Sequence, residues 1–260
     1  MPSPMLTVTV QVPGRRVKVS HPAPGGPVRL DQLLPFMYAV DNAVIDVGVG
    51  QQRAQGRTVT CRKGCDTCCR AQPVPVTPAE TLAIAQLVQA MPPARQARVR
   101  ARFADGVERL RAAGLHDTQL RDEPTTSPQQ ALAVVATYFS LGLACPFLED
   151  GACSIHADRP FVCRQYLVTS PATLCADPLN APVAVVPMPL RPVGSMLQVA
   201  TAVTGRQQLT VPLMLALVYA ERHADELQRT ADARQTLASW LDNLSPQGPS
   251  APPAPTHPRA

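Results

Sequence analysis

Aromatic residues and lysines are scarce in this chain of 260 residues. Phe, Trp and Tyr together make up 4% of it, so we expect a core built largely from Ala, Leu and Val. Lys18 and Lys63 are the only lysines, and arginine supplies nearly all of the positive charge. The formal net charge is a modest +5, and few aromatic rings are available to stack on bases. The composition therefore gives no strong nucleic-acid signal.

Signals for secretion and membrane insertion are also lacking. Residues 1–10 carry no positive charge and no apolar run long enough for a secretory signal. The stretch 131–147 comes closest to a membrane span, but polar and small residues interrupt it, and it is shorter than the about 20 apolar residues that a span needs. We interpret this stretch as a buried helix. We expect a cytoplasmic protein with reduced thiols and no membrane partner.

The remaining composition favours a globular chain cut into short elements. Hydrophobic residues make up 45% of it, and 29 prolines divide it. Polar and apolar residues alternate over 7–12 and again from Val17, after the turn Pro13-Gly14, which predicts a β-hairpin. Apolar spacing and helix start signals predict helices over 31–52, 77–91, 94–113, 127–144, 211–222 and 231–244.

Three of these helices begin with a capping signal. Asp31 can cap the first, Thr77-Pro78-Ala79-Glu80 forms a capping box for the second, and Ser127-Pro128 opens the fourth in the same style. The sequence thus predicts a mainly α fold, namely a helical domain with an N-terminal β-hairpin and an irregular Cys-rich centre. We expect the hairpin and a loop over 1–27, the helical domain over 28–244, and a disordered, proline-rich tail over 245–260.

Eight cysteines fall into two groups along the chain. The first group, Cys61-Arg-Lys-Gly-Cys65-Asp-Thr-Cys68-Cys69, places four thiols within nine residues. Short spacers bring neighbouring sulfurs together, and Gly64 permits a tight turn. Spacers of seven, nine and eleven residues separate the members of the second group, Cys145, Cys153, Cys163 and Cys175. These longer spacers require the surrounding fold or a metal to bring the thiols together.

Disulfides and inert core thiols are the alternatives to metal binding. A reduced compartment disfavours disulfides. The Cα atoms of the adjacent residues Cys68 and Cys69 lie about 3.8 Å apart across a trans peptide, whereas an unstrained disulfide needs roughly 4.4–6.8 Å. Isolated buried thiols are common, but four within nine residues are not expected by chance. Metal binding is therefore the interpretation that we favour.

Positively charged residues accompany both groups. Arg62, Lys63 and Arg70 flank the first, and Arg159 and Arg164 lie inside the second. Four thiolates on one zinc ion leave a net charge of about −2, which such cations would stabilise. The alternative for each is an exposed, solvated side chain.

The spacing leaves the metal open. Four-thiolate sites suit zinc and iron–sulfur clusters alike. The spacing of Cys61, Cys65 and Cys68 is also that of radical S-adenosylmethionine enzymes. In those enzymes a long series of alternating strands and helices follows the motif, whereas a Pro-rich loop and amphipathic helices follow it here. The sequence therefore disfavours radical chemistry of that type.

A family resemblance adds to this reading. After the first group the chain continues with Cys145-Pro-Phe-Leu, Cys153-Ser-Ile155-His156, Arg159-Pro160, Cys163-Arg164-Gln-Tyr166 and Cys175. This order, over about 59–175, resembles the YkgJ-like (CxxCxxCC) family of zinc- or iron-chelating proteins. The resemblance implies an iron–sulfur cluster or zinc as cofactor, held by Cys61, Cys65, Cys68, Cys69, Cys145, Cys153, Cys163 and Cys175. Two positions depart from the pattern: His156 stands where Tyr is usual, and three residues separate the first two cysteines.

The resemblance implies metal binding without a settled reaction. Related proteins include flagellin lysine N-methylases, so an iron–sulfur dependent protein lysine N-methyltransferase is the alternative function. No Gly-rich cofactor loop supports it independently. A third possible function is binding of nucleic acid or a protein partner through the arginines of 94–113. The alternative is that these arginines form an ordinary solvated helix face. These arginines are Arg95, Arg98, Arg102 and Arg109.

Overall fold

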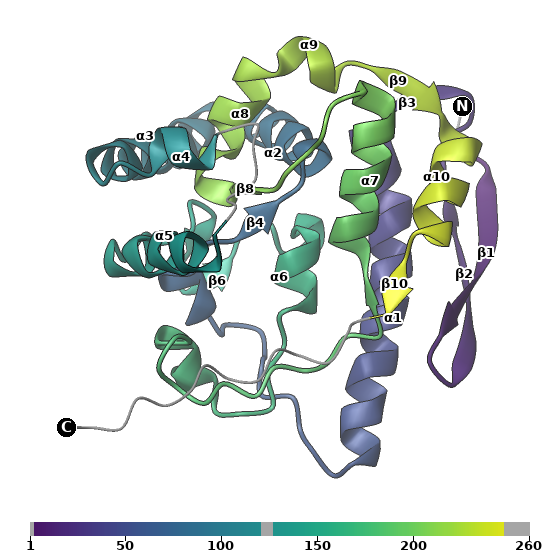
Figure 1. Cartoon of the computed structure of the whole chain (residues 1–260), viewed down its shortest axis with the longest axis horizontal. Coiled ribbons are helices and arrows are strands. Elements are labelled where there is room, and N and C mark those ends of the chain that lie inside the picture. The colour runs from purple at the N-terminus through teal and green to yellow at the C-terminus, as the bar shows by residue number, and fades with distance from the viewer. Residues whose placement is uncertain (1–2, 121–126, 247–260) are drawn as a thin grey trace.

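The computed structural model describes residues 3–120 and 127–246. Helices dominate it, as predicted, and they surround a centre made of loops and short elements (Figure 1). The longer helices are α1 (Leu34–Ala54), α2 (Pro78–Gln89), α3 (Pro93–Ala112), α5 (Pro128–Ser140), α7 (Pro192–Thr204) and α10 (Ala233–Asp242). The shorter ones are α4 (His116–Gln119), α6 (Phe161–Gln165), α8 (Ala216–Arg222) and α9 (Ala224–Leu227). Single 3₁₀ turns are η1 (Leu30–Leu33), η2 (Cys68–Arg70), η3 (His156–Asp158), η4 (Ala172–Ala176) and η5 (Leu213–Leu215).

The N-terminal β-hairpin is confirmed. Strand β1 (Met5–Val12) pairs antiparallel with β2 (Arg15–Pro22), and Val12 lies opposite Arg15 across the turn. Gly14 adopts a φ of 82°, which a residue with a side chain rarely tolerates. Apolar side chains on one face, among them Val10 and Val19, are buried against the core that α1 crosses.

The other strands are short ties between segments that are distant in the sequence. Each forms a two-stranded antiparallel ladder with one partner. The pairs are β3 (Pro27–Arg29) with β9 (Thr230–Asp232), β4 (Pro75–Val76) with β8 (Val211–Pro212), β5 (Leu148–Glu149) with β6 (Ala152–Cys153), and β7 (Leu190–Arg191) with β10 (Ser245–Pro246).

Two hydrophobic clusters make up the core. The first joins the hairpin, α1, α7 and α10, and the second joins α2, α3, α8 and part of α5. Although aromatic residues are few, they anchor both clusters. Phe161 stacks on Trp240 in the first, with ring centroids 6.4 Å apart, and Phe103 meets Phe147 edge-to-face at 5.6 Å in the second.

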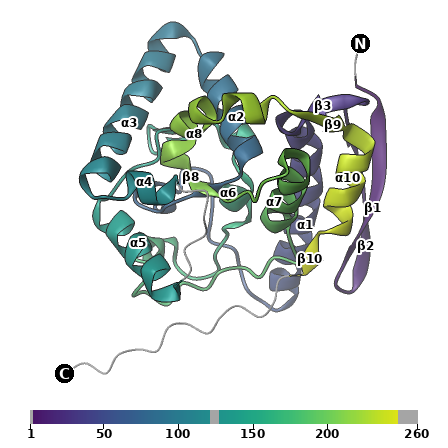
Figure 2. The same ribbon diagram turned by 45° about the horizontal axis from the view of Figure 1, so that its top comes forward.

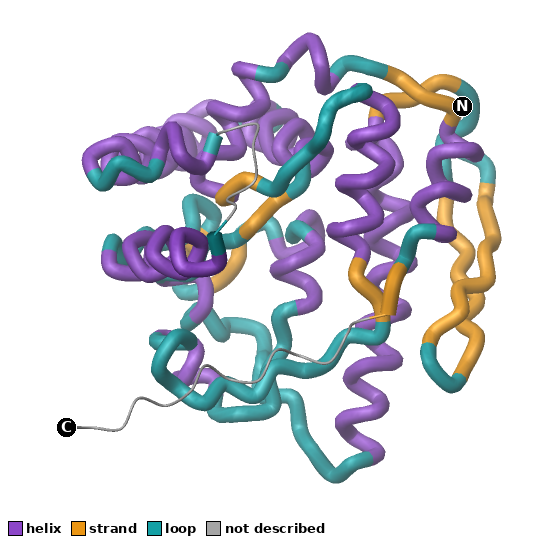
Figure 3. Tube along the Cα trace, in the orientation of Figure 1, coloured by secondary structure: helices purple, strands orange, loops and turns teal. Residues whose placement is uncertain are grey.

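The Cys-rich segment lies between these two clusters. Phe161 at the start of α6 belongs to the first cluster, whereas Phe147 and Ile155 belong to the second. Two views place α6 between the α3–α5 side and the α1–α7 side of the molecule (Figures 1 and 2). Long loops gather at the end of the molecule where α1 terminates (Figure 3). Both sides of the fold therefore support the segment that carries the second cysteine group.

Helix starts differ from expectation at two positions. Asp31 does not cap α1, because it lies in η1 and its carboxylate accepts hydrogen bonds of 3.0 Å from the Arg29 side chain. The residue that precedes α1 is Leu33. Ser127 precedes α5 but makes no capping hydrogen bond with its side chain. The Thr77–Glu80 capping box at α2 is present as predicted.

The expectation of a buried helix over 131–147 is wrong. Helix α5 ends at Ser140, and Gly142 follows with a φ of 57°. Tyr138 is buried, whereas 59% of Leu132 is exposed, because α5 covers the outer side of the second cluster. By length and composition alone, one helical stretch of the described chain, 30–54, could cross a membrane, and 56% of its apolar window is buried in the core.

The last third of the chain was predicted least well. Helix α7 was not expected at all. The expected helix 211–222 is divided into β8, η5 and α8, and α10 starts at Ala233, where the Asp232 side chain accepts a hydrogen bond from the Gln235 amide. The division into 1–27, 28–244 and 245–260 stays a prediction. Strand β10 occupies the first two residues of the expected tail, and 247–260 lie outside the described residues.

Candidate metal centre

The first cysteine group forms a compact loop between α1 and β4. The amide of Cys65 donates to the carbonyl of Arg62 at 2.9 Å, and the amide of Cys69 donates to that of Asp66 at 2.9 Å. Gly64 has a φ of 84°, so the tight turn expected before Cys65 is present. The loop therefore has its own folded shape.

Hydrogen bonds join this loop to the second cysteine group. The amide of Cys145 donates to the carbonyl of Cys69 at 2.7 Å, and the Gln72 side chain donates to the carbonyl of Cys175 at 3.0 Å. Just before the loop, the Thr60 hydroxyl donates to the carbonyl of Ser170 at 2.6 Å. Hydrogen bonds to main-chain carbonyls thus bring together segments that carry cysteines far apart in the sequence.

A tight β-hairpin holds Cys153, and Cys145 lies just before its first strand. Cys153 lies in β6 opposite Leu148 of β5. The turn between these strands uses Asp150 and Gly151, whose φ values are 49° and 70°. A Cβ atom added to Gly151 would lie 3.8 Å from the Asp66 carboxylate, so this turn approaches the first group.

Helix α6 carries Cys163, and a buried carboxylate fixes its start. Glu80, 1% exposed, accepts a hydrogen bond of 2.7 Å from the amide of Phe161 and one of 3.2 Å from the Tyr38 hydroxyl. Its other oxygen accepts from the amide and hydroxyl of Thr77 at 2.8 and 2.9 Å. The capping box was visible in the sequence, but its additional role in holding α6 was not.

The two residues after Cys163 fasten α6 to α1. The Arg164 guanidinium lies 4.1 Å from the centre of the Tyr38 ring and donates to the Asn42 side chain at 3.2 Å. It also donates to the carbonyl of Arg159 at 2.6 Å. Gln165 donates to the Asp41 carboxylate at 2.7 Å. Sequence reasoning missed Tyr38 and Asp41, because no local pattern marks them.

All eight cysteines are free thiols, and several of them affect one another's pKa values. Burial raises the pKa of Cys163 well above its ordinary value, and Cys145, Cys68 and Cys153 raise it further. Burial likewise raises the pKa of Cys175, with added effects from Cys68, Cys61 and Cys65. A hydrogen bond to Cys69 is the main cause that raises the pKa of Cys68. Members of both groups therefore lie close enough to influence one another.

The eight cysteines supply the type of ligand that zinc ions and iron–sulfur clusters bind. Sulfur ligands are those that both prefer, and a metal ion would stabilise the thiolates that burial disfavours. The positions of the thiols do not yet form a metal site. Over residues 3–120 and 127–246, no group of three or more His, Cys, Asp or Glu side chains is arranged to hold a metal ion. The eight-ligand assignment stays a prediction, and metal uptake would require the sulfurs to move together.

The structure also places the other residues that the sequence analysis named. His156 is exposed in η3, and its carbonyl accepts a hydrogen bond of 3.2 Å from Arg159. The Gln72 side chain approaches the Tyr166 hydroxyl at 3.5 Å. Two of the α3 arginines contact the segment that carries Cys145 and Cys153, because Arg95 donates to the Glu149 carboxylate and Arg102 to the carbonyl of Pro146. Arg98, Arg102 and Arg109 are exposed, and binding of nucleic acid or a partner through this face stays a prediction.

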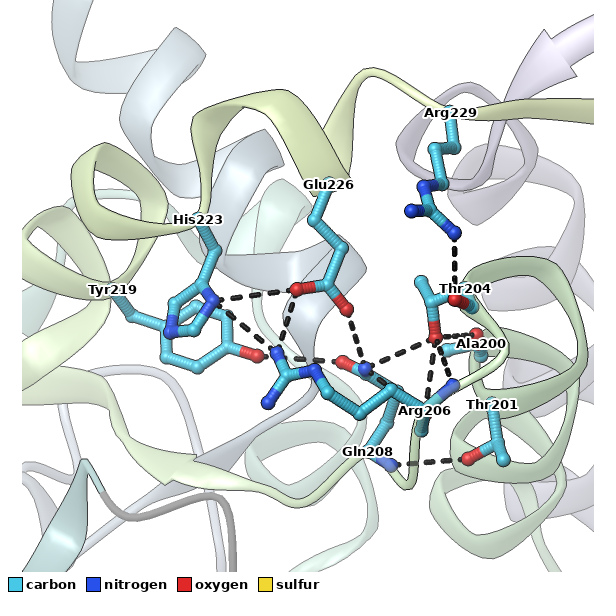
Figure 4. Close-up of polar contacts among 9 residues, drawn as sticks. All are labelled: Ala200, Thr201, Thr204, Arg206, Gln208, Tyr219, His223, Glu226 and Arg229. Carbon is cyan, nitrogen blue, oxygen red and sulfur yellow. Dashed lines mark hydrogen bonds and ion pairs between the residues drawn. The ribbon is translucent and has the colours of Figure 1, made fainter.

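A second polar cluster lies away from the cysteines, between α7 and α8–α9 (Figure 4). Glu226 pairs with Arg206 at 2.6 Å and accepts a hydrogen bond of 2.6 Å from Gln208. His223 stacks on the Tyr219 ring, with centroids 4.2 Å apart, and its Nδ1 lies 3.3 Å from the Glu226 carboxylate. These interactions attach the loop between α7 and β8 to α8 and α9, which indicates that the cluster has a structural role.

Comparison with known proteins agrees with the cysteine pattern. Residues 60–178 match the model of the CxxCxxCC family, described as "Putative zinc- or iron-chelating domain". The match includes both cysteine groups and η4. No curated protein and no solved structure shows significant similarity to the chain.

Proposed function

Because residues 60–178 form a domain of the CxxCxxCC family, we propose that this protein binds zinc or an iron–sulfur cluster through cysteines of both groups. The observation that carries the proposal is the junction between the groups. The bond from the Cys145 amide to the Cys69 carbonyl, and the effects of Cys68 and Cys145 on the pKa of Cys163, support metal binding by cysteines of both groups. Metal uptake would draw these free thiols together and remove their protons.

The charges around the thiols support the same proposal. The Arg159 guanidinium lowers the pKa of both Cys61 and Cys153, although burial, the larger effect, raises it for each. One cation therefore lies near a thiol of each group. Four thiolates on a zinc ion carry a net charge of about −2, and a neighbouring guanidinium would stabilise them. When bound, the metal would supply the positive charge that keeps the sulfurs deprotonated.

Eight thiols are enough for two mononuclear sites or for one or two clusters. The family description names zinc or iron and no reaction. No observation favours the lysine N-methyltransferase alternative, which stays a prediction. We place the protein in the cytoplasm as part of this proposal, because reduced thiols persist there.

Elemental analysis tests the proposal directly. The protein is purified without oxygen from cells supplied with iron and zinc, and iron, zinc, acid-labile sulfide and visible absorbance are measured per chain. We expect at least one metal ion per chain, with sulfide and colour if the metal is a cluster. A folded, colourless protein that holds neither metal, and takes up neither when both are offered anaerobically, would overturn the proposal.

A further inference from the structure

Helix α3 contacts the cysteine-bearing β5–β6 hairpin through a pair of arginines. Arg95 and Arg102 lie two helical turns apart, on the same face of α3. Both reach Glu149, at 3.1 Å from Arg95 and 3.6 Å from Arg102. The Glu149 side chain is 19% exposed, so this three-charge group is partly shielded from water. Partial shielding makes it stronger than an isolated surface ion pair.

The same arginines hold the main chain beside the cysteines. Arg102 donates to the carbonyl of Pro146 at 3.1 Å, directly after Cys145. Arg95 donates to the carbonyl of Ser154 at 3.2 Å, directly after Cys153. One arginine is therefore bound directly after Cys145, just before the hairpin, and the other directly after Cys153 at its end. Since carbonyl oxygens are the acceptors, these contacts fix the path of the backbone from which the thiols project.

Packing beneath the arginines strengthens this attachment. Phe147, fully buried, meets Phe103 of α3 edge-to-face, with ring centroids 5.6 Å apart. The amide and hydroxyl of Ser154 both donate to the carbonyl of Phe147 at 2.9 Å, which closes the hairpin. The hairpin is thus attached to α3 both by the apolar contact of Phe147 and by the charged group around Glu149. We use the name α3 clamp for Arg95, Arg102 and Glu149.

We propose that the α3 clamp positions Cys145 and Cys153 for metal binding. The inference rests on the proposed function, and it assigns a positioning role to an arginine face that the sequence left as solvated or nucleic-acid binding. Without the clamp the hairpin stays tethered by Phe147, but the thiols of Cys145 and Cys153 sample more positions. The metal must then restrict them, so affinity falls. Loss of groups that orient metal ligands typically weakens binding about 10–100-fold.

Arg98 provides a matched control, because it is exposed on the same helix. The variants are the double Arg95→Gln/Arg102→Gln, the milder Glu149→Gln, and Arg98→Gln as control. Arg95→Lys tests rescue, since lysine keeps the charge but cannot bind a carboxylate and a carbonyl with the same planar group. Each full-length protein is titrated anaerobically with Co²⁺ and then Zn²⁺, and sulfur-to-cobalt absorption and affinity are recorded.

The expected result is an affinity at least about tenfold lower in the double variant, with altered cobalt absorption, and wild-type behaviour in Arg98→Gln. Arg95→Lys is expected to lie between the two. Equal affinity and identical spectra in the double variant and the wild type would overturn the inference. If the double variant does not fold, Glu149→Gln decides the question in the same way.

A second measurement separates this inference from the proposed function. Failure of the wild type to bind either metal would remove the proposed function, but the clamp can still be tested in the metal-free protein. Alkylation of individual thiols is then followed by mass spectrometry. Faster labelling of Cys145 and Cys153 in the double variant, with Cys61 unchanged, supports the clamp. Equal labelling rates in the variant and the wild type would contradict it.

Discussion

The amide of Cys145 donates a hydrogen bond of 2.7 Å to the carbonyl of Cys69. This bond joins the two cysteine groups through main-chain atoms, so it does not depend on a metal. The Gln72 side chain donates to the carbonyl of Cys175 and adds a second link that needs no metal. The protein therefore brings the groups together by folding, and a metal would complete a partly formed site. Metal loss should weaken the fold without abolishing it.

Replacing one ligand from each group tests this view. We expect Cys65→Ser and Cys163→Ser to lower metal content and thermal stability together, because metal bound only to the folded state stabilises it. A hundredfold loss of affinity corresponds to about 2.7 kcal/mol when metal was near saturation. Elemental analysis and thermal unfolding check both effects. The control is chelated wild type, which should melt close to the chelated variants; unchanged metal content and melting in both variants would contradict the assignment.

Metal uptake should release protons and strengthen as pH rises. Burial raises the pKa of Cys145 to about 12 and also raises that of Cys163, so these thiols are protonated at pH 7 before metal binds. Each thiol that becomes a ligand loses its proton, and apparent affinity should therefore increase up to about tenfold per pH unit for each proton released. Zinc titrations in buffers of different ionisation enthalpy count the protons. Affinity that is constant between pH 6 and 8 would argue against thiolate ligands.

Glu80 should be essential for the position of α6. Its carboxylate accepts hydrogen bonds from Phe161, Tyr38 and Thr77 in a fully buried setting. We expect Glu80→Ala to lower the free energy of unfolding by about 3–5 kcal/mol, because buried donors lose their acceptor and a cavity forms. Tyr38→Phe removes one of these bonds and should cost only about 1 kcal/mol. Denaturant unfolding measures both, and equal effects of the two substitutions would exclude a special role for Glu80.

Local signals in the sequence predicted the elements that depend on local chemistry. Helix α2 was recognised because Thr77 and Glu80 form a capping box, and the hairpin because apolar residues alternate around Gly14. The cysteine order predicted a resemblance to the family whose model matches residues 60–178. Helix α7 has Pro192 at its start and Gly205 in a left-handed conformation at its end, so a start and a stop signal were present but were not combined.

Partners across the fold could not be predicted. The periodicity of α3 placed Arg95 and Arg102 on one face, but it could not show that Glu149 and loop carbonyls bind them. The apolar residues of α5 indicated a helix without indicating which side the core would cover, and Leu132 is exposed as a result. The links between Cys69 and Cys145 and between Gln72 and Cys175 are tertiary, and no spacing rule contains them.

Close packing between α3 and η5 gives a test of the fold itself. Gly106 lies so near Met214 that an added Cβ would meet its Sδ at 2.2 Å. We expect Gly106→Ala to lower stability by about 1–3 kcal/mol, although alanine is the better helix former. Gly50 in α1 has open space around it, so Gly50→Ala should raise stability by about 0.5–1 kcal/mol. Thermal unfolding compares the two variants, and a stabilising Gly106→Ala would show that α3 packs differently.

A buried carboxyl next to α6 should make stability depend on pH. Asp41 is 2% exposed; Gln165 donates to its Oδ1, and no described residue contacts its Oδ2 through a hydrogen bond. Burial raises its pKa to about 7, against the smaller opposing effects of Gln165 and Arg164. Between pH 4 and 7 the folded chain therefore binds a proton that the unfolded chain has released. Its contribution to stability is greatest near pH 4 and is lost as pH rises through 7.

Asp41→Asn removes this titration while keeping an acceptor for Gln165. Because about three pH units separate the folded and unfolded pKa values, the wild type should lose up to about 4 kcal/mol relative to this variant between pH 4 and 8. Asp46→Asn, an exposed change on the same helix, should follow the wild type at every pH. Denaturant unfolding of chelated proteins at pH 4, 6 and 8 measures the difference and excludes titration of metal ligands. Parallel curves for wild type and Asp41→Asn would mean that Asp41 is ionised in the folded protein, with water or an additional cation reaching its second oxygen.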